Sequence, residues 1–60
     1  MSSEDLFKIL RTNGWELSRT NGSHHIFKRP GEKGIVVVPH PRKDIPKGTL
    51  NSILKQAGLI

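Results

Sequence analysis

The sequence predicts an α+β fold, a two-layer sandwich in which a helix, three antiparallel strands and a second helix follow one another along the chain. One segment near each end places apolar residues at helical spacing. Between them, three short segments have strand-like patterns and are separated by glycine and proline. Two helices with one apolar stripe each must cover an apolar surface, and a three-stranded sheet has one face to offer. We therefore expect one domain over residues 1–60, with both helices on one face of the sheet.

The first helix is expected over about Ser3–Asn13. Ser2 or Ser3 can cap it, and Asp5 stands three residues after Ser2, as in a capping box. Gly14 follows as a left-handed stop. Apolar residues recur within the segment at helical spacing: Leu6, Ile9 and Leu10.

Three strands are expected next, over residues 15–20, about His24–Arg29 and Ile35–Val38. The first alternates apolar and polar residues, and the third is a run of β-branched residues. A hairpin turn at Asn21 and Gly22 joins the first two strands. The loop before the third strand contains Pro30, Gly31 and Gly34.

Prolines delay the second helix. Pro39 and Pro41 interrupt regular structure, whereas Pro46 suits the first turn of a helix, and Gly58 ends that helix. Its apolar stripe consists of Leu50, Ile53, Leu54 and Ala57.

The period of the second strand separates two adjacent histidines. Alternation places His25 on the face of Phe27, and His24 on the opposite face with Lys28. We expect Phe27 on the core side, because pairing it with Leu17 buries the largest side chains together. The set expected to be buried is Trp15, Leu17, Phe27, Val36 and Val38.

This register conflicts with the shortest hairpin. A two-residue turn at Asn21 and Gly22 would pair Leu17 with Ile26, and a shift of one residue reverses every side chain. We therefore infer a three-residue loop that includes Ser23, with Gly22 at positive φ.

The second hairpin places a third histidine at the same end of the sheet. If Lys28 pairs with Ile35, then His24 pairs with Pro39, and His40 lies near His24. Two imidazoles at that end could act as general base and general acid. The alternatives are that His24 is a surface histidine at the end of a turn and that His25 is a hydrogen-bonded residue at the edge of the core.

The amino-acid composition indicates which binding partners and cofactors to expect. Ten Lys and Arg residues stand against five Asp and Glu, which gives a net charge of +5 and favours polyanions such as nucleic acid. The alternative is a solvated cationic face. The absence of cysteine excludes disulfides and thiolate metal sites, and adjacent histidines on a strand point to opposite faces, so we expect no metal or cofactor. No apolar run could cross a bilayer, and we expect a cytoplasmic protein with no membrane partner.

Motifs along nearly the whole chain resemble the HicA family of toxins, the small partner in prokaryotic toxin–antitoxin pairs. The motifs are Gly14–Trp15, the run Gly22–Phe27, the valines leading into Pro39–His40, Lys47–Leu50, and Ile53–Leu59. The resemblance implies a fold like that of a double-stranded RNA-binding domain and an mRNA interferase that a HicB-type antitoxin inhibits. In that family the histidine after Gly and Ser is catalytic, which corresponds to His24; some members have their only histidine at the next position, here His25.

We therefore expect a metal-independent ribonuclease that binds and cleaves mRNA. His24 is the first candidate for proton transfer, His25 is the second choice, and His40 is a candidate second group. The expected RNA-binding residues are Ser23, Lys28, Arg29, Arg42 and Lys43. Two alternatives are a non-catalytic RNA-binding module and a protein-interaction domain whose basic surface meets an acidic partner.

Overall fold

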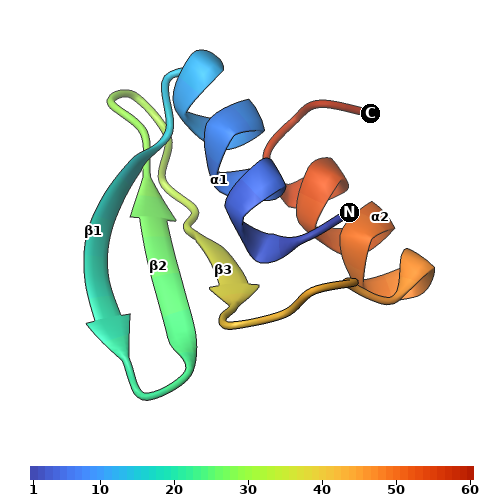
Figure 1. The fold of residues 1–60 in the computed structure, drawn as a ribbon. Helices are drawn as coiled ribbons and strands as arrows, with labels where there is room; N and C mark the ends of the chain where they lie inside the picture. Colours follow the sequence, from blue (N-terminus) through green and yellow to red (C-terminus); the bar gives the residue numbers. More distant parts are fainter.

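A computed structural model describes residues 1–60. The elements are α1 (Ser3–Thr12), β1 (Glu16–Asn21), β2 (His24–Lys28), β3 (Val36–Pro39) and α2 (Lys47–Gln56). The strands form one antiparallel sheet in the order β1-β2-β3, and α2 lies on the side away from β1 (Figure 1). This arrangement confirms the predicted α+β order. Neither helix has the length and apolar character that a membrane crossing requires.

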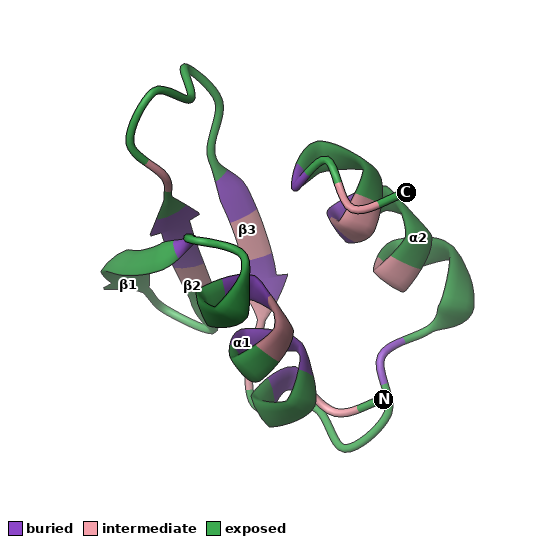
Figure 2. Cartoon of the chain, turned by 90° about the horizontal axis from the view of Figure 1, so that it is seen from above, coloured by how far each residue is buried: buried purple, intermediate pink, exposed green.

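The core lies between the two helices and one face of the sheet (Figure 2). Four of the five residues expected to be buried together belong to it, but Leu17 is 45% exposed, so that expectation was wrong. Leu17 belongs to β1, an edge strand that is exposed at every residue. The core takes side chains from β2 and β3 but none from β1. The core consists of Leu6, Phe7, Leu10, Trp15, Phe27, Val36, Val38, Ile45, Ile53 and Ala57.

Helix α1 begins with the predicted capping box. The Asp5 backbone N–H donates to Ser2 Oγ at 3.1 Å, and the Ser2 N–H donates back to the Asp5 carboxylate at 3.3 Å. The helix ends at Thr12, one residue earlier than expected, and Gly14 follows with φ +86°. Two N–H groups that the first turn leaves unpaired are therefore satisfied within the chain.

Replacing Ser2 by alanine should weaken this cap. The hydrogen bonds from Ser2 hold the pKa of Asp5 below its ordinary value of 3.8, so their stabilisation is present above that value and is lost as the pH falls through the lowered pKa. We expect Ser2→Ala to reduce the free energy of unfolding by about 1 kcal/mol. It should raise the pKa of Asp5 only in part, because the backbone N–H of residue 2, the larger cause of the lowered pKa, remains. Urea unfolding and an NMR titration of the Asp5 carboxyl measure both quantities. Ser2→Thr keeps the hydroxyl and should preserve them, and unchanged values in Ser2→Ala would contradict the capping role.

The first hairpin has the expected register, reached by a different route. Leu17 pairs with Phe27 as predicted, but Asn21 pairs with His24, so the loop has two residues and the three-residue loop was wrong. A bulge between Leu17 and Arg19 supplies the extra residue instead. A two-residue loop at Asn21 and Gly22 with a regular ladder would pair Leu17 with Ile26, so pairing Leu17 with Phe27 requires one extra residue between them. The bulge places this residue in β1 and not in the loop. Gly22 has the expected positive φ, +59°.

The second hairpin agrees with the prediction. Ile26 pairs with Val37, and His24 pairs with Pro39. Strand β3 begins one residue later than expected and includes Pro39, which an edge position permits because its missing N–H need not enter the ladder. This pairing brings the start of β2 beside the segment that leads from β3 to α2.

Helix α2 follows Pro46, which occupies the cap position rather than the first turn. Two residues of its predicted stripe, Ile53 and Ala57, are buried, and Leu50 and Leu54 pack partly buried against the core. The preceding segment, residues 40–46, has no regular structure, and we call it the connector. It carries His40, Arg42 and Lys43, three of the predicted site residues.

Candidate active site and nucleic-acid interface

His24 is exposed at the start of β2, immediately after the turn formed by Gly22 and Ser23. His25 is partly buried and pairs with Val38, a core residue. The predicted difference in exposure between the two histidines is therefore confirmed. The ladder bonds of β2 fix the backbone of His24, so its imidazole projects from a defined point on the sheet.

The face of the sheet opposite the helices places cations along the strand from His24, and we call it the open face. By strand alternation His24 and Lys28 share this face, about 13 Å apart along β2. Arg19 pairs with Ile26, which lies between them on the same strand. Both cations are exposed and neither forms an ion pair. Arg19 is not among the residues expected at the site, because without the bulge it would pair with His25 on the opposite face of the sheet.

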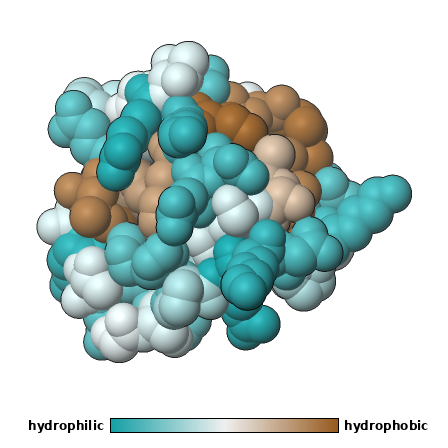
Figure 3. All heavy atoms as spheres, viewed as in Figure 1, coloured by the Kyte–Doolittle hydropathy of each residue, from teal (hydrophilic) through white to brown (hydrophobic).

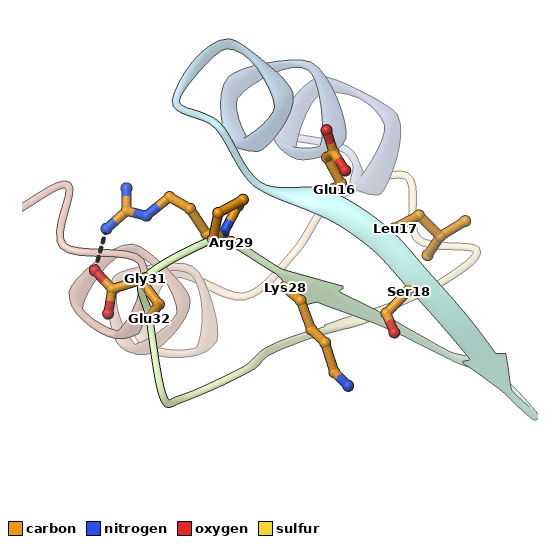
Figure 4. Close-up of a pocket in the computed structure, with 8 residues that line it drawn as sticks. Glu16, Leu17, Ser18, Lys28, Arg29, Gly31 and Glu32 are labelled. Carbon is orange, nitrogen blue, oxygen red and sulfur yellow. Dashed lines mark hydrogen bonds and ion pairs between the residues drawn. The ribbon is translucent and has the colours of Figure 1, made fainter.

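Lys28 lines a pocket of about 490 Å³ where β1 and β2 meet the loop after β2. Figure 4 shows its side chain extending away from Arg29 and Glu16, with no partner. The pocket is open and polar apart from Leu17. Its lining residues are Glu16, Leu17, Ser18, Lys28, Arg29, Pro30, Gly31 and Glu32.

Arg29, in contrast, is bound by the protein itself. Its guanidinium forms an ion pair with Glu32, donates to the carbonyl of Asn13 at 3.2 Å, and lies 4.7 Å from the centre of the Trp15 ring (Figure 4 shows the ion pair). Its stem also lies close to Gly14. These contacts join the loop after β2 to the turn after α1, which gives Arg29 a structural role.

His25 and His40 form an aromatic cluster with Phe7 on the helix side of the sheet. Their ring centres are 4.6 Å apart, and both lie within 5.2 Å of the Phe7 ring centre. The Nδ1 atom of each histidine is buried without a hydrogen-bond partner. The His40 backbone N–H donates to the carbonyl of Ser23 at 2.7 Å, as its expected position implies. Its ring, however, packs against His25 and not against His24.

The connector forms a second cationic surface beside this cluster. A cleft of about 490 Å³ separates it from the N-terminus of α1. Arg42 and Lys43 line the cleft with exposed side chains that form no ion pair, and Glu4 is its one acidic group. The remaining lining residues are Ser2, His40 and Pro41. No three histidine or carboxylate side chains gather closely enough to hold a metal ion.

Comparison with known proteins identifies the chain. Residues 3–59 match the family model described as the HicA toxin of bacterial toxin–antitoxin systems. A solved structure titled "HicA3 and HicB3 toxin-antitoxin complex" is similar with a TM-score of 0.86 and 40% identity, over 98% of this chain and 96% of that one. A search of curated proteins gave no match. Because the match spans nearly the whole domain in both sequence and fold, the chain belongs to the HicA family of toxins of bacterial toxin–antitoxin systems.

Proposed function

We propose that this toxin is an endoribonuclease that cleaves mRNA in the cytoplasm by histidine acid/base catalysis without a metal. The observation that carries the proposal is the exposed His24, held between a tight turn and a strand on a sheet face with two unpaired cations. Membership of a toxin family and the net charge of +5 support a polyanion as the target.

The chemistry requires only groups that the chain has. The RNA 2′-hydroxyl lies beside its own phosphate, so an imidazole that removes its proton lets the 2′-oxygen attack phosphorus. A new P–O2′ bond forms, the P–O5′ bond breaks, and the protonated imidazole returns its proton to the departing 5′-oxygen. The products are a 2′,3′-cyclic phosphate and a 5′-hydroxyl. His24 can perform both proton transfers in turn, because an imidazole that has accepted a proton can donate it again.

The cations would hold the backbone and stabilise charge on the phosphate oxygens. Arg19 and Lys28 on the open face would contact phosphates on one side of His24, and Ser23 would contact RNA at the turn next to it. Arg42 and Lys43 would act on the connector side. We assign Arg29 a structural role and not an RNA-binding one, because its guanidinium is already bound to Asn13 and Glu32 and lies over Trp15.

If a second histidine takes part in proton transfer, two pairs are candidates: His24 with His40, and His25 with His40. His40 lies at the same end of the sheet as His24, and its N–H bond to Ser23 ties the connector to the turn. The closer imidazole pair is His25 with His40, 4.6 Å apart, although both Nδ1 atoms are buried there. We favour His24 as the primary group because it is the most exposed of the three histidines.

A HicB-type antitoxin is the proposed protein partner. The solved relative is a complex of HicA3 with HicB3. The sheet offers such a partner apolar side chains as well as cations, since Leu17 on β1 and Ile35 before β3 are 45% and 41% exposed. Figure 3 shows apolar surface on the side of β1 amid largely hydrophilic atoms. An antitoxin seated there would cover His24 and exclude RNA.

The proposal is tested with an RNA oligonucleotide, two changes to the reaction and an analysis of the product ends. We expect cleavage in the presence of a chelator, a cyclic phosphate at the 3′ end of the upstream product, and no cleavage of the all-deoxy oligonucleotide, which lacks the nucleophile. Product ends are identified by mass spectrometry. Cleavage of the DNA, or loss of cleavage on chelation that added metal restores, would contradict the mechanism.

A non-catalytic RNA-binding module remains the second candidate, favoured by the same cations. It would bind RNA with a steep salt dependence and leave it intact, and substitution of His24 would scarcely change binding. Purified protein that binds RNA without cutting it over a long incubation would support this module and would refute the nuclease.

A further inference from the structure

We propose that Ser3 is a positioning residue that fixes the connector, so that Arg42 and Lys43 bind the phosphate of a nucleotide flanking the cleavage site. The inference rests on the proposed function and adds to it a second phosphate subsite, the cleft between the connector and α1. The subsite would contribute to RNA binding and not to proton transfer.

Ser3 is the only polar residue that the fold buries completely. Its hydroxyl donates to the carbonyl of Pro39 at 2.7 Å and lies 3.5 Å from that of Arg42, while its backbone N–H donates to the same Arg42 carbonyl at 3.0 Å. A buried hydroxyl costs free energy unless it is hydrogen-bonded, and here the shorter bond goes to Pro39, the last residue of β3 before the connector, and the longer one to Arg42 within it. The first turn of α1 therefore anchors a segment about 36 to 39 residues away in sequence.

The far end of the connector is anchored as well. The Ile45 N–H donates to the carbonyl of Met1 at 2.8 Å, and the Ile45 side chain is buried in the core. The terminal ammonium of Met1 lies 3.1 Å from the Asp44 carboxylate. An irregular segment that is fixed at both ends loses little further entropy when its tip binds a ligand. The exposed tip carries Arg42 and Lys43.

The connector is also joined to the turn that precedes His24. The His40 N–H donates to the Ser23 carbonyl at 2.7 Å, and Pro39 pairs with His24 in the ladder. The two cationic surfaces thus lie on either side of one backbone junction next to His24. An RNA strand that crosses His24 would have the open-face cations on one side and the connector cations on the other.

The side-chain cations, and not the end of the helix, would attract the phosphate. The N–H groups of Ser3 and Asp5 are already bonded to Arg42 and Ser2. Glu4 lines the same cleft and opposes an anion. Arg42 and Lys43 have no protein partner, so their charge is free for RNA.

The first test measures binding of a uniformly 2′-O-methylated RNA oligonucleotide, which cannot be cleaved, over a range of salt concentrations. Removing both cations with Arg42→Gln and Lys43→Gln should lower the slope of log affinity against log salt by about 1.4, as two lost contacts to a single strand imply. The control removes the same charge with Lys8→Gln and Lys55→Gln on exposed helix surfaces, and should leave the slope near that of the unmodified chain. Equal slopes for the two double variants would overturn the subsite.

The second test asks whether Ser3 acts through those cations. Ser3→Ala should weaken binding of the same RNA on the order of tenfold in the otherwise unmodified chain, and should have little further effect once Arg42 and Lys43 are replaced, since residues that act together are not additive. Circular dichroism confirms the fold of each variant. Additive effects, or unchanged affinity in folded Ser3→Ala, would overturn the positioning role. If Ser3→Ala does not fold, the charge variants still decide the subsite, because their side chains lie outside the core.

The two proposals fail in distinguishable ways. RNA that binds but is never cleaved by the unmodified protein refutes the nuclease and leaves the binding subsite standing. Active cleavage with no difference between the charge variants refutes the subsite alone.

Discussion

Replacing His24 by alanine should reduce the rate of RNA cleavage by about 10²–10⁴-fold, the usual contribution of a positioned acid/base group. His24 is exposed and makes no hydrogen bond through its side chain, so the variant should fold with stability close to that of the unmodified chain. Its affinity for uncleavable RNA should change little. Single-turnover cleavage and binding of 2′-O-methyl RNA, measured on the same preparation, separate the loss of chemistry from a loss of binding.

His25→Ala and His40→Ala are the matched controls. Each removes an imidazole at the same end of the sheet, but each also removes a ring that packs against Phe7, so both should lower stability as well. Rates are therefore compared at a temperature where all three variants are folded. If His24→Ala keeps full activity while folded His25→Ala or His40→Ala loses it, the reaction belongs to the half-buried pair His25 and His40, and our assignment is wrong.

Local patterns were sufficient to predict most of the fold. The capping box at Ser2, the stop at Gly14 and the β-branched third strand depend on neighbours in sequence, and all were confirmed. The bulge near Ser18 was not foreseen, because one extra residue in a hairpin can be placed in the loop or in the strand with the same final register. Leu17 was misassigned because alternation gives the face of a strand but not how far the helices extend over it.

The candidate site depended more on tertiary contacts. The exposure of His24 followed from the strand period, whereas the packing of His25 and His40 against Phe7 of α1 joins elements far apart in sequence. A count of charges cannot distinguish the two arginines. The guanidinium of Arg29 is bound to Glu32 and lies over Trp15, whereas Arg19 is exposed and forms no ion pair. The connector bonds of Ser3 join residues far apart in sequence, and no local pattern indicates them.

Replacing Trp15 by alanine should unfold most of the protein. Trp15 is 1% exposed in the centre of the core, its Nε1–H donates to the Ala57 carbonyl at 3.3 Å, and the Arg29 guanidinium lies over its ring. Truncating a buried aromatic to alanine costs about 3–5 kcal/mol. A core of this size supplies a net stability of only about 3–5 kcal/mol, so the loss is comparable to the whole.

Trp15→Phe is the matched control, because it keeps an aromatic ring in the core and removes the N–H bond to Ala57. We expect it to remain folded with a Tm lower by about 4–8 °C for each kcal/mol lost. Trp15 is the only tryptophan, so far-UV circular dichroism and amide NMR spectra replace fluorescence as the measurement. A Trp15→Ala variant that unfolds at the same denaturant concentration as the unmodified chain would show that the contacts of Trp15 with Ala57 and Arg29 contribute little to stability.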